Sequence, residues 1–112
     1  MNAFYDSLET RDPAEREAHL FSCLPSVLRA AMAAPAYAER LRGIDPAAIA
    51  DRAALAGLPV LRKSDLPALH KANPPFGGLM PQPAGSFARL FISPGPIFEP
   101  EGKEHDVWRI GL

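Results

Sequence analysis

The sequence predicts an α+β or mainly α chain in which several short helices precede one strand. Three observations indicate this class. Apolar residues recur at helical spacing through the first half of the chain, prolines stand where helices would begin, and Ser86 to Ser93 is rich in residues that favour strands. We divide the chain into an extended lead-in (1–11), a helical segment (12–75), and a loop, a strand and the start of a helix (76–112).

Composition excludes two classes of partner. The formal net charge is -1, whereas a protein that neutralises nucleic-acid phosphates needs a basic face, so we expect no nucleic-acid partner. No apolar run is long enough to cross a bilayer, and residues 1–12 lack the basic and apolar regions of a secretory signal. We therefore expect a cytoplasmic protein without a membrane partner.

The single cysteine, Cys23, fits a reducing compartment, because one cysteine cannot form an intrachain disulfide. Apolar residues flank it in the stretch HLFSCLP. Buried thiols are common and unreactive, so we predict a buried structural thiol and not a nucleophile.

The first helix signals stand at Asp12. This residue is a good N-cap, Pro13 fits the first helical position, and Glu15 completes the spacing of a capping box. The apolar residues that follow fall mostly on one helical face; they are Ala18, Phe21, Cys23, Leu24, Val27, Leu28 and Ala31.

Two features modify this first section of the chain. Tyr5 and Leu8 are expected to anchor the extended lead-in on the surface of the domain. Pro25 interrupts the helical pattern and removes a hydrogen-bond donor, so we expect a kink or a short break there.

Three further short helices are predicted before residue 76. The first lies within Ala33 to Gly43; Pro35 opens it, Gly43 ends it, and Tyr37 and Leu41 can pack together as an i, i+4 pair.

The next two helices use similar signals. In one, Asp45 caps, Pro46 starts and Gly57 stops the helix. The other lies within Leu61 to Pro75; Ser64 caps it or it begins just before Ser64, and two prolines end it.

The last section contains a loop and a strand. Glycines and prolines predict the loop over Phe76–Gly85, and Ser86–Ser93 is the clearest strand. A strand needs a partner for its backbone groups, and none is evident. After Gly102 a helix is expected to begin, with Trp108 in the core. An unpaired strand and a helix cut short predict the front end of something longer.

The remaining chemical groups are predicted to be structural. His19 and His70 are expected to be surface or packed histidines. Lys63 is expected to face solvent near a helix N-terminus, and Glu99 and Glu101 to lie on a solvated loop and not in a metal site.

Several short motifs occur in a fixed order along the chain. They are an aromatic residue followed by Glu-Thr (Tyr5, Glu9, Thr10), P-x-Y-x-x-x-L (Pro35, Tyr37, Leu41), L-x-x-L-P (Leu55, Leu58, Pro59), K-x-D-L (Lys63, Asp65, Leu66) and NPPFGGL (Asn73 to Leu79). In this order and spacing, the chain resembles the opening of the phenylacetate–CoA ligase family of AMP-forming adenylating enzymes.

The resemblance implies a fold and an activity. The chain would be the N-terminal helical portion that leads into the first strand of an adenylating-enzyme α/β domain. ATP and a small-molecule aromatic carboxylate would give an acyl-adenylate and pyrophosphate, and coenzyme A would then displace AMP. The implied cofactors are ATP and coenzyme A, and Mg²⁺ could accompany the nucleotide. The family's later catalytic motifs are absent, so a fragment of this kind is expected to be inactive alone.

The family's nucleotide loop, which usually reads like SSGTTGKP, follows this strand. Here the stretch is SPGPIFEP, in which Ser93, Gly95 and Pro100 match and Glu99 stands in the place of the lysine. Proline at positions 94 and 96 removes backbone donors, and the glutamate would repel a triphosphate. Ser93 and Gly95 are therefore the candidate nucleotide-loop residues, and phosphate binding itself is in doubt.

Two alternatives remain open. The chain could be a stand-alone helical interaction module, which could form a homodimer, in which the strand pairs with a partner's edge. The other alternative is that the chain is a full-length relative of the adenylating enzymes, which keeps their fold but does not use the usual phosphate loop.

Overall fold

The structure, a computed structural model, describes residues 3–103. Helices make up about half of it and a two-stranded antiparallel sheet follows them, so the predicted α+β class is confirmed at this level. The elements are α1 (Pro13–Ala31), α2 (Pro35–Arg40), α3 (Arg52–Ala56), α4 (Leu66–Ala72), β1 (Arg89–Ser93) and β2 (Ile97–Glu101). The helix expected after Gly102, with Trp108, lies outside the described residues.

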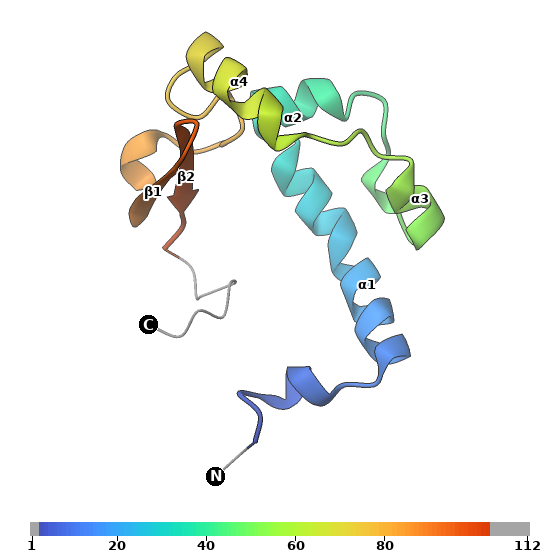
Figure 1. Cartoon of the computed structure of the whole chain (residues 1–112). Coiled ribbons are helices and arrows are strands. Elements are labelled where there is room, and N and C mark those ends of the chain that lie inside the picture. The colour runs from blue at the N-terminus through green and yellow to red at the C-terminus, as the bar shows by residue number, and fades with distance from the viewer. Residues whose placement is uncertain (1–2, 104–112) are drawn as a thin grey trace.

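Helix α1 forms a long rod whose C-terminal end meets the other helices (Figure 1). The side chain of Asp12 caps it, accepting from the backbone N–H groups of Ala14 at 2.8 Å and Glu15 at 3.3 Å, as predicted. The break expected at Pro25 is wrong, because α1 continues through it to Ala31. Helical hydrogen bonds on both sides, and the packing of Leu24 and Leu28 into the core, hold the two halves in one helix.

Three leucine and isoleucine side chains form the centre of the helical core. Leu28 of α1, Leu41 at the end of α2 and Ile49 are between 5% and 8% exposed and pack together. The predicted pair of Tyr37 and Leu41 is confirmed, since Tyr37 packs against this cluster. The remaining partly buried neighbours are Leu24, Met32, Ile44, Ala54 and Leu58.

The helix predicted from Pro46 to Gly57 is wrong as a single element. Asp45 caps only a 3-10 helix over Pro46–Ala48, and a second cap begins α3 at Asp51, whose carboxylate accepts from the N–H of Ala54 at 2.8 Å. An aspartate that bonds its own backbone offers an alternative to a continuous helix, which explains the division.

One of the two predicted starts for the next helix is confirmed, because a helical turn begins just before Ser64, and Ser64 itself does not cap α4. A 3-10 helix over Lys63–Asp65 precedes it, and the Asp65 carboxylate accepts from the N–H of Arg62 at 3.2 Å. A carboxylate is a stronger acceptor than the Ser64 hydroxyl at a helix start, because the N-terminal end of a helix carries a partial positive charge.

The lead-in is not fully extended as predicted. Ser7–Thr10 forms a 3-10 helix, because the Asp6 carboxylate accepts from the N–H of Leu8 at 2.7 Å. Tyr5 is 69% exposed and Leu8 46% exposed, so neither side chain is buried against the rest of the domain.

Cys23 is exposed, so the predicted buried thiol is wrong. The apolar stripe of α1 is wider than the surface that covers it, because the 46–48 turn and the end of α2 pack on it around Leu28, towards its C-terminal end. Leu20 and Val27 are consequently 57% and 59% exposed. Within residues 3–103, no helix combines the length and the apolar character needed to cross a bilayer.

The uneven cover of α1 gives a stability test within one helix. We expect Leu28→Ala to lower the free energy of unfolding by about 2–4 kcal/mol, because it opens a cavity in the core. The matched variant Leu20→Ala removes the same atoms from an exposed site and should cost less than about 0.5 kcal/mol. Urea unfolding followed by circular dichroism measures both, and equal losses would contradict the core described above.

Candidate functional site

The candidate nucleotide loop forms part of a β-hairpin. Strand β1 pairs with β2 in antiparallel register, from Arg89 opposite Glu101 to Ser93 opposite Ile97. The predicted strand is thus confirmed over Arg89–Ser93, and the expectation that it has no partner within the chain is wrong. Its partner is the stretch we assigned to the loop.

A missed sequence signal explains this difference. Ile97 and Phe98 are strand-favouring residues, and they follow a three-residue turn that contains Gly95, a common hairpin connection. The proline-rich composition and the comparison with a nucleotide loop concealed the pattern. Pro100 is accommodated because both strands of a two-stranded sheet are edge strands.

The turn offers few hydrogen-bond donors. Between Ser93 and Ile97, only Gly95 carries a backbone N–H, because the residues on either side of it are prolines. Gly95 has a φ of +156°, and a Cβ there would lie 2.8 Å from Cγ1 of Ile97. Glycine at this position is therefore required by the close approach of Ile97.

The two candidate residues differ in their surroundings. Ser93 Oγ is a buried side-chain oxygen with no hydrogen-bond partner within residues 3–103. Gly95 lies on the exposed turn. The hairpin therefore brings the two candidates close in space, but it holds the hydroxyl in the protein interior and leaves one N–H at the tip. A phosphate cradle needs several converging donors.

The two glutamates lie on β2 and not on a loop as we expected. Glu99 is exposed, opposite Phe91. Glu101 forms an ion pair with Arg89 across the hairpin at 2.5 Å. No cluster of three histidine, cysteine, aspartate or glutamate residues that could hold a metal occurs in the described part of the chain.

The hairpin rests against α4 through His70. This side chain is 6% exposed, and its Nδ1 accepts a hydrogen bond from the N–H of Phe98 at 3.5 Å. The two rings also face each other with centroids 5.8 Å apart. The prediction of packed or surface histidines is confirmed for His70 and for His19, which is exposed, and Lys63 faces solvent as expected.

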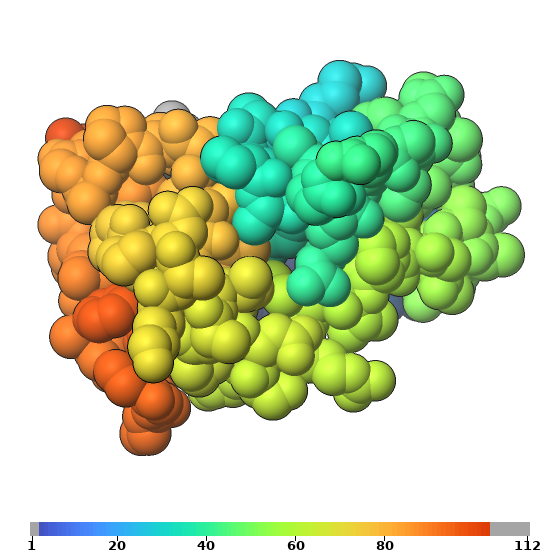
Figure 2. Space-filling model, turned by 90° about the horizontal axis from the view of Figure 1, so that it is seen from above, coloured from blue at the N-terminus to red at the C-terminus, as the bar shows by residue number. Residues whose placement is uncertain are grey.

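The Phe76–Gly77 segment fills the space between α4 and the hairpin. Gly77 has a φ of +66°, and a Cβ there would lie 2.8 Å from Cβ of Leu69. The ring of Phe76 meets Phe87 edge to face, with centroids 5.5 Å apart. The space-filling view shows this end of the molecule, in yellow and orange, packed on one side of the helices (Figure 2).

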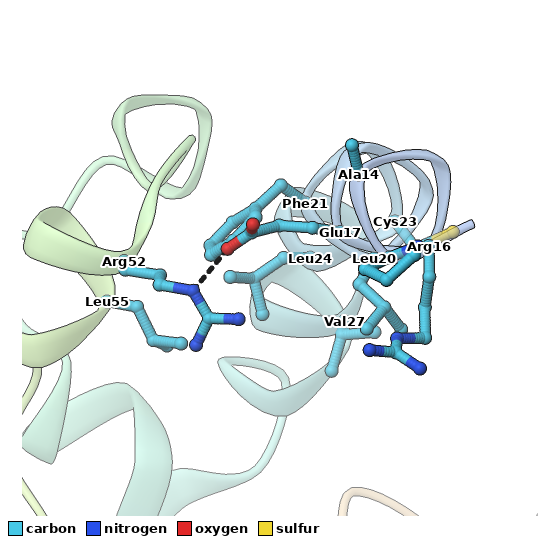
Figure 3. Close-up of a pocket in the computed structure, with 11 residues that line it drawn as sticks. Ala14, Arg16, Glu17, Leu20, Phe21, Cys23, Leu24, Val27, Arg52 and Leu55 are labelled. Atoms are coloured by element: carbon cyan, nitrogen blue, oxygen red, sulfur yellow. Dashed lines mark ion pairs between the residues drawn. The ribbon is translucent and has the colours of Figure 1, made fainter.

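A second feature, the α1–α3 groove, lies on the opposite side of the helical core. It has a volume of about 640 Å³. The ion pair between Glu17 and Arg52 closes one side of it (Figure 3). Its apolar lining is Leu20, Phe21, Leu24, Val27 and Leu55. The sequence predicted Phe21, Leu24 and Val27 on one apolar face of a helix but did not predict a groove. The signal for the groove was an apolar stripe too wide for the short elements that follow to cover.

Comparison of the chain with protein-family models, curated proteins and solved structures found no match in any of the three.

The close approach at Gly77 can be tested by substitution. We expect Gly77→Ala to lower the free energy of unfolding by at least about 2 kcal/mol, because it adds a positive φ for alanine to a steric overlap with Leu69. Gly43 also has a positive φ, of 78°, but has nothing within 4 Å of a Cβ. Gly43→Ala should therefore cost only about 1 kcal/mol. Thermal or urea unfolding that ranks the two variants equally would contradict the packing of this segment.

Proposed function

We propose that this chain is the N-terminal segment of an AMP-forming acyl-CoA ligase that resembles phenylacetate–CoA ligase. The observation that carries the proposal is the ordered series of motifs, from the Pro35–Leu41 segment to the hairpin that contains Ser93 and Gly95. The complete enzyme would join an aromatic carboxylate to coenzyme A at the expense of ATP.

The structural roles of the motif residues support this proposal. Tyr37 and Leu41 pack in the helical core, and Asp65 caps the turn that leads into α4. Phe76 and Gly77 lie buried between α4 and the hairpin. Because these five motif residues have structural roles, the series of motifs fits a scaffold that supports the first strand of a larger domain.

The proposed segment contributes structure and not catalysis. The hairpin tip has one backbone N–H, and a triphosphate near Glu99 would meet a like charge. Mg²⁺ between the phosphates and the glutamates could reduce that repulsion, but Glu101 is already paired with Arg89. We therefore assign the chemistry with ATP, coenzyme A and the acid to residues of the family's later motifs.

The first prediction from this proposal is an absence of turnover. With ATP, coenzyme A, Mg²⁺ and phenylacetate, the 112-residue chain should release pyrophosphate no faster than a reaction without protein, because the activating residues of the family are missing. A coupled pyrophosphate assay measures this. Robust turnover by the chain alone would contradict the proposal that this segment contributes structure and not catalysis.

A repaired turn supplies the matching positive test. In the triple variant Pro94→Ser, Pro96→Thr, Glu99→Lys, the donors and the positive charge of the family loop are restored. We expect ATP affinity to rise at least about tenfold in calorimetry, since the charge reversal alone changes a close contact by about 2 kcal/mol in water. Glu39→Lys, which changes the same charge on exposed α2, should leave ATP affinity unchanged. Equal affinities in both variants would argue against a loop of nucleotide-binding ancestry.

A second candidate function is an interaction module without catalysis. The observation that favours it is the α1–α3 groove, in which Leu20, Val27 and Leu55 are between 42% and 59% exposed. Apolar surface gathered in one groove is typical of a protein–protein contact. Strand β2 already pairs with one edge of β1, and we place the contact between copies in the groove, where the exposed apolar side chains gather.

Light scattering after size-exclusion chromatography tests this second function. If the groove joins two copies, the mass should double with rising concentration. Val27→Lys should then restore the monomer mass, because it places a charge in the groove. Val60 is 72% exposed and lies outside the groove, so Val60→Lys should leave the dimer intact. A monomer at all concentrations would remove this alternative.

A further inference from the structure

One histidine connects the hairpin to the helices. His70 stands in the last turn of α4 and is buried beside β2. Its Nδ1 accepts from the backbone N–H of Phe98, and its ring packs on the ring of the same residue. Contact between α4 and β2 is the principal packing of a strand on a helix in the described chain. The position of the hairpin therefore depends on this side chain.

The hydrogen bond requires one protonation state of the imidazole. A neutral imidazole has one nitrogen with a lone pair and one that carries a proton. Since Nδ1 of His70 accepts from Phe98, the proton of the neutral ring must be on Nε2. A second proton can only bind at Nδ1, on the lone pair that the Phe98 N–H uses. Imidazolium has two N–H donors and no acceptor, so the proton and the hairpin compete for one atom.

We propose that His70 is a pH-sensitive latch, which holds β2 on α4 when the ring is neutral and releases it when the ring is protonated. The latch is a property of the fold and goes beyond the ligase proposal, because it does not require the hairpin to bind a nucleotide. The edge contact between Phe76 and Phe87 does not involve His70. Release would therefore affect β2 and leave the base of the hairpin attached.

Charged groups on the surrounding elements do not provide a partner for the protonated ring. Asp65 accepts from the N–H of Arg62, Glu101 pairs with Arg89, and His70 takes part in no ion pair in the described chain. The other charged residues on these elements are Lys63 and Lys71 beside His70, Glu99 on β2, and Glu39 and Arg40 on α2. Glu39 pairs with Arg42, and Arg40 donates to the carbonyl of Val60.

Hydrogen exchange of the Phe98 amide in the full 112-residue chain tests the latch. We compare its protection factor at about pH 7.5 and about pH 5, which bracket the range where histidine ordinarily changes charge. The wild-type protein should lose about fivefold in protection on acidification, the usual worth of one hydrogen bond. The Leu41 amide, bonded to the Tyr37 carbonyl at 2.9 Å in the core, should change little.

Two substitutions at His70 separate the acceptor from the ring. His70→Asn places an amide oxygen near the position of Nδ1 but does not titrate, so Phe98 should stay protected at both pH values. His70→Phe keeps a ring without an acceptor and should lower protection at both. His19→Asn changes an exposed histidine and should retain the wild-type pH dependence.

Three results would each overturn the latch. They are equal protection of the Phe98 amide at both pH values in the wild type, a pH dependence that survives in His70→Asn, and a parallel loss of protection at the Leu41 amide. If a variant does not fold, NMR spectra of the wild-type protein alone still test the proposal. The ring signals of His70 and the Phe98 amide shift should titrate with one midpoint in NMR spectra, and two different midpoints would also overturn the proposal.

Discussion

The packing of Leu28, Leu41 and Ile49 holds the helical part of this chain together. Apart from α1, each helix has seven residues or fewer, a length at which an isolated helix is unstable in water. Their persistence depends on burial against one another and on side-chain caps. Asp12 and Asp51 cap α1 and α3, whereas α2 has no side-chain cap. The three buried side chains supply the contacts that hold these short elements together.

The hairpin depends on this core only indirectly, through α4 and the segment after it. The Ala36 N–H donates to the Gly78 carbonyl at 2.9 Å, which ties α2 to the loop beside α4. Gly77 lies against Leu69 and His70 of α4, and His70 in turn contacts Phe98 of the hairpin. Any ligand or partner that meets the tip at Gly95 therefore meets a feature whose placement is set by buried residues of α4. The proposed supporting role in a larger enzyme is consistent with such an arrangement.

Much of the helical part was predictable because its signals are local. Asp12 with Pro13, and Pro35 at the start of α2, predicted helix starts that the structure confirms. The exposure of Cys23 was not predictable, because periodicity indicates which face of a helix is apolar but not how much of that face another element covers. The pairing of β1 was missed for a related reason: the partner strand contains a proline and two glutamates, and only the three-dimensional register reveals it.

The turn of the hairpin also has a consequence for the unfolded chain. Pro94 and Pro96 restrict the backbone before folding begins, so less conformational entropy is lost when the strands meet. Residues 89–101 are thus a local unit that can form early, before distant helices dock. A turn of this kind is preorganised, and a molecule that binds it must fit a shape that is already set.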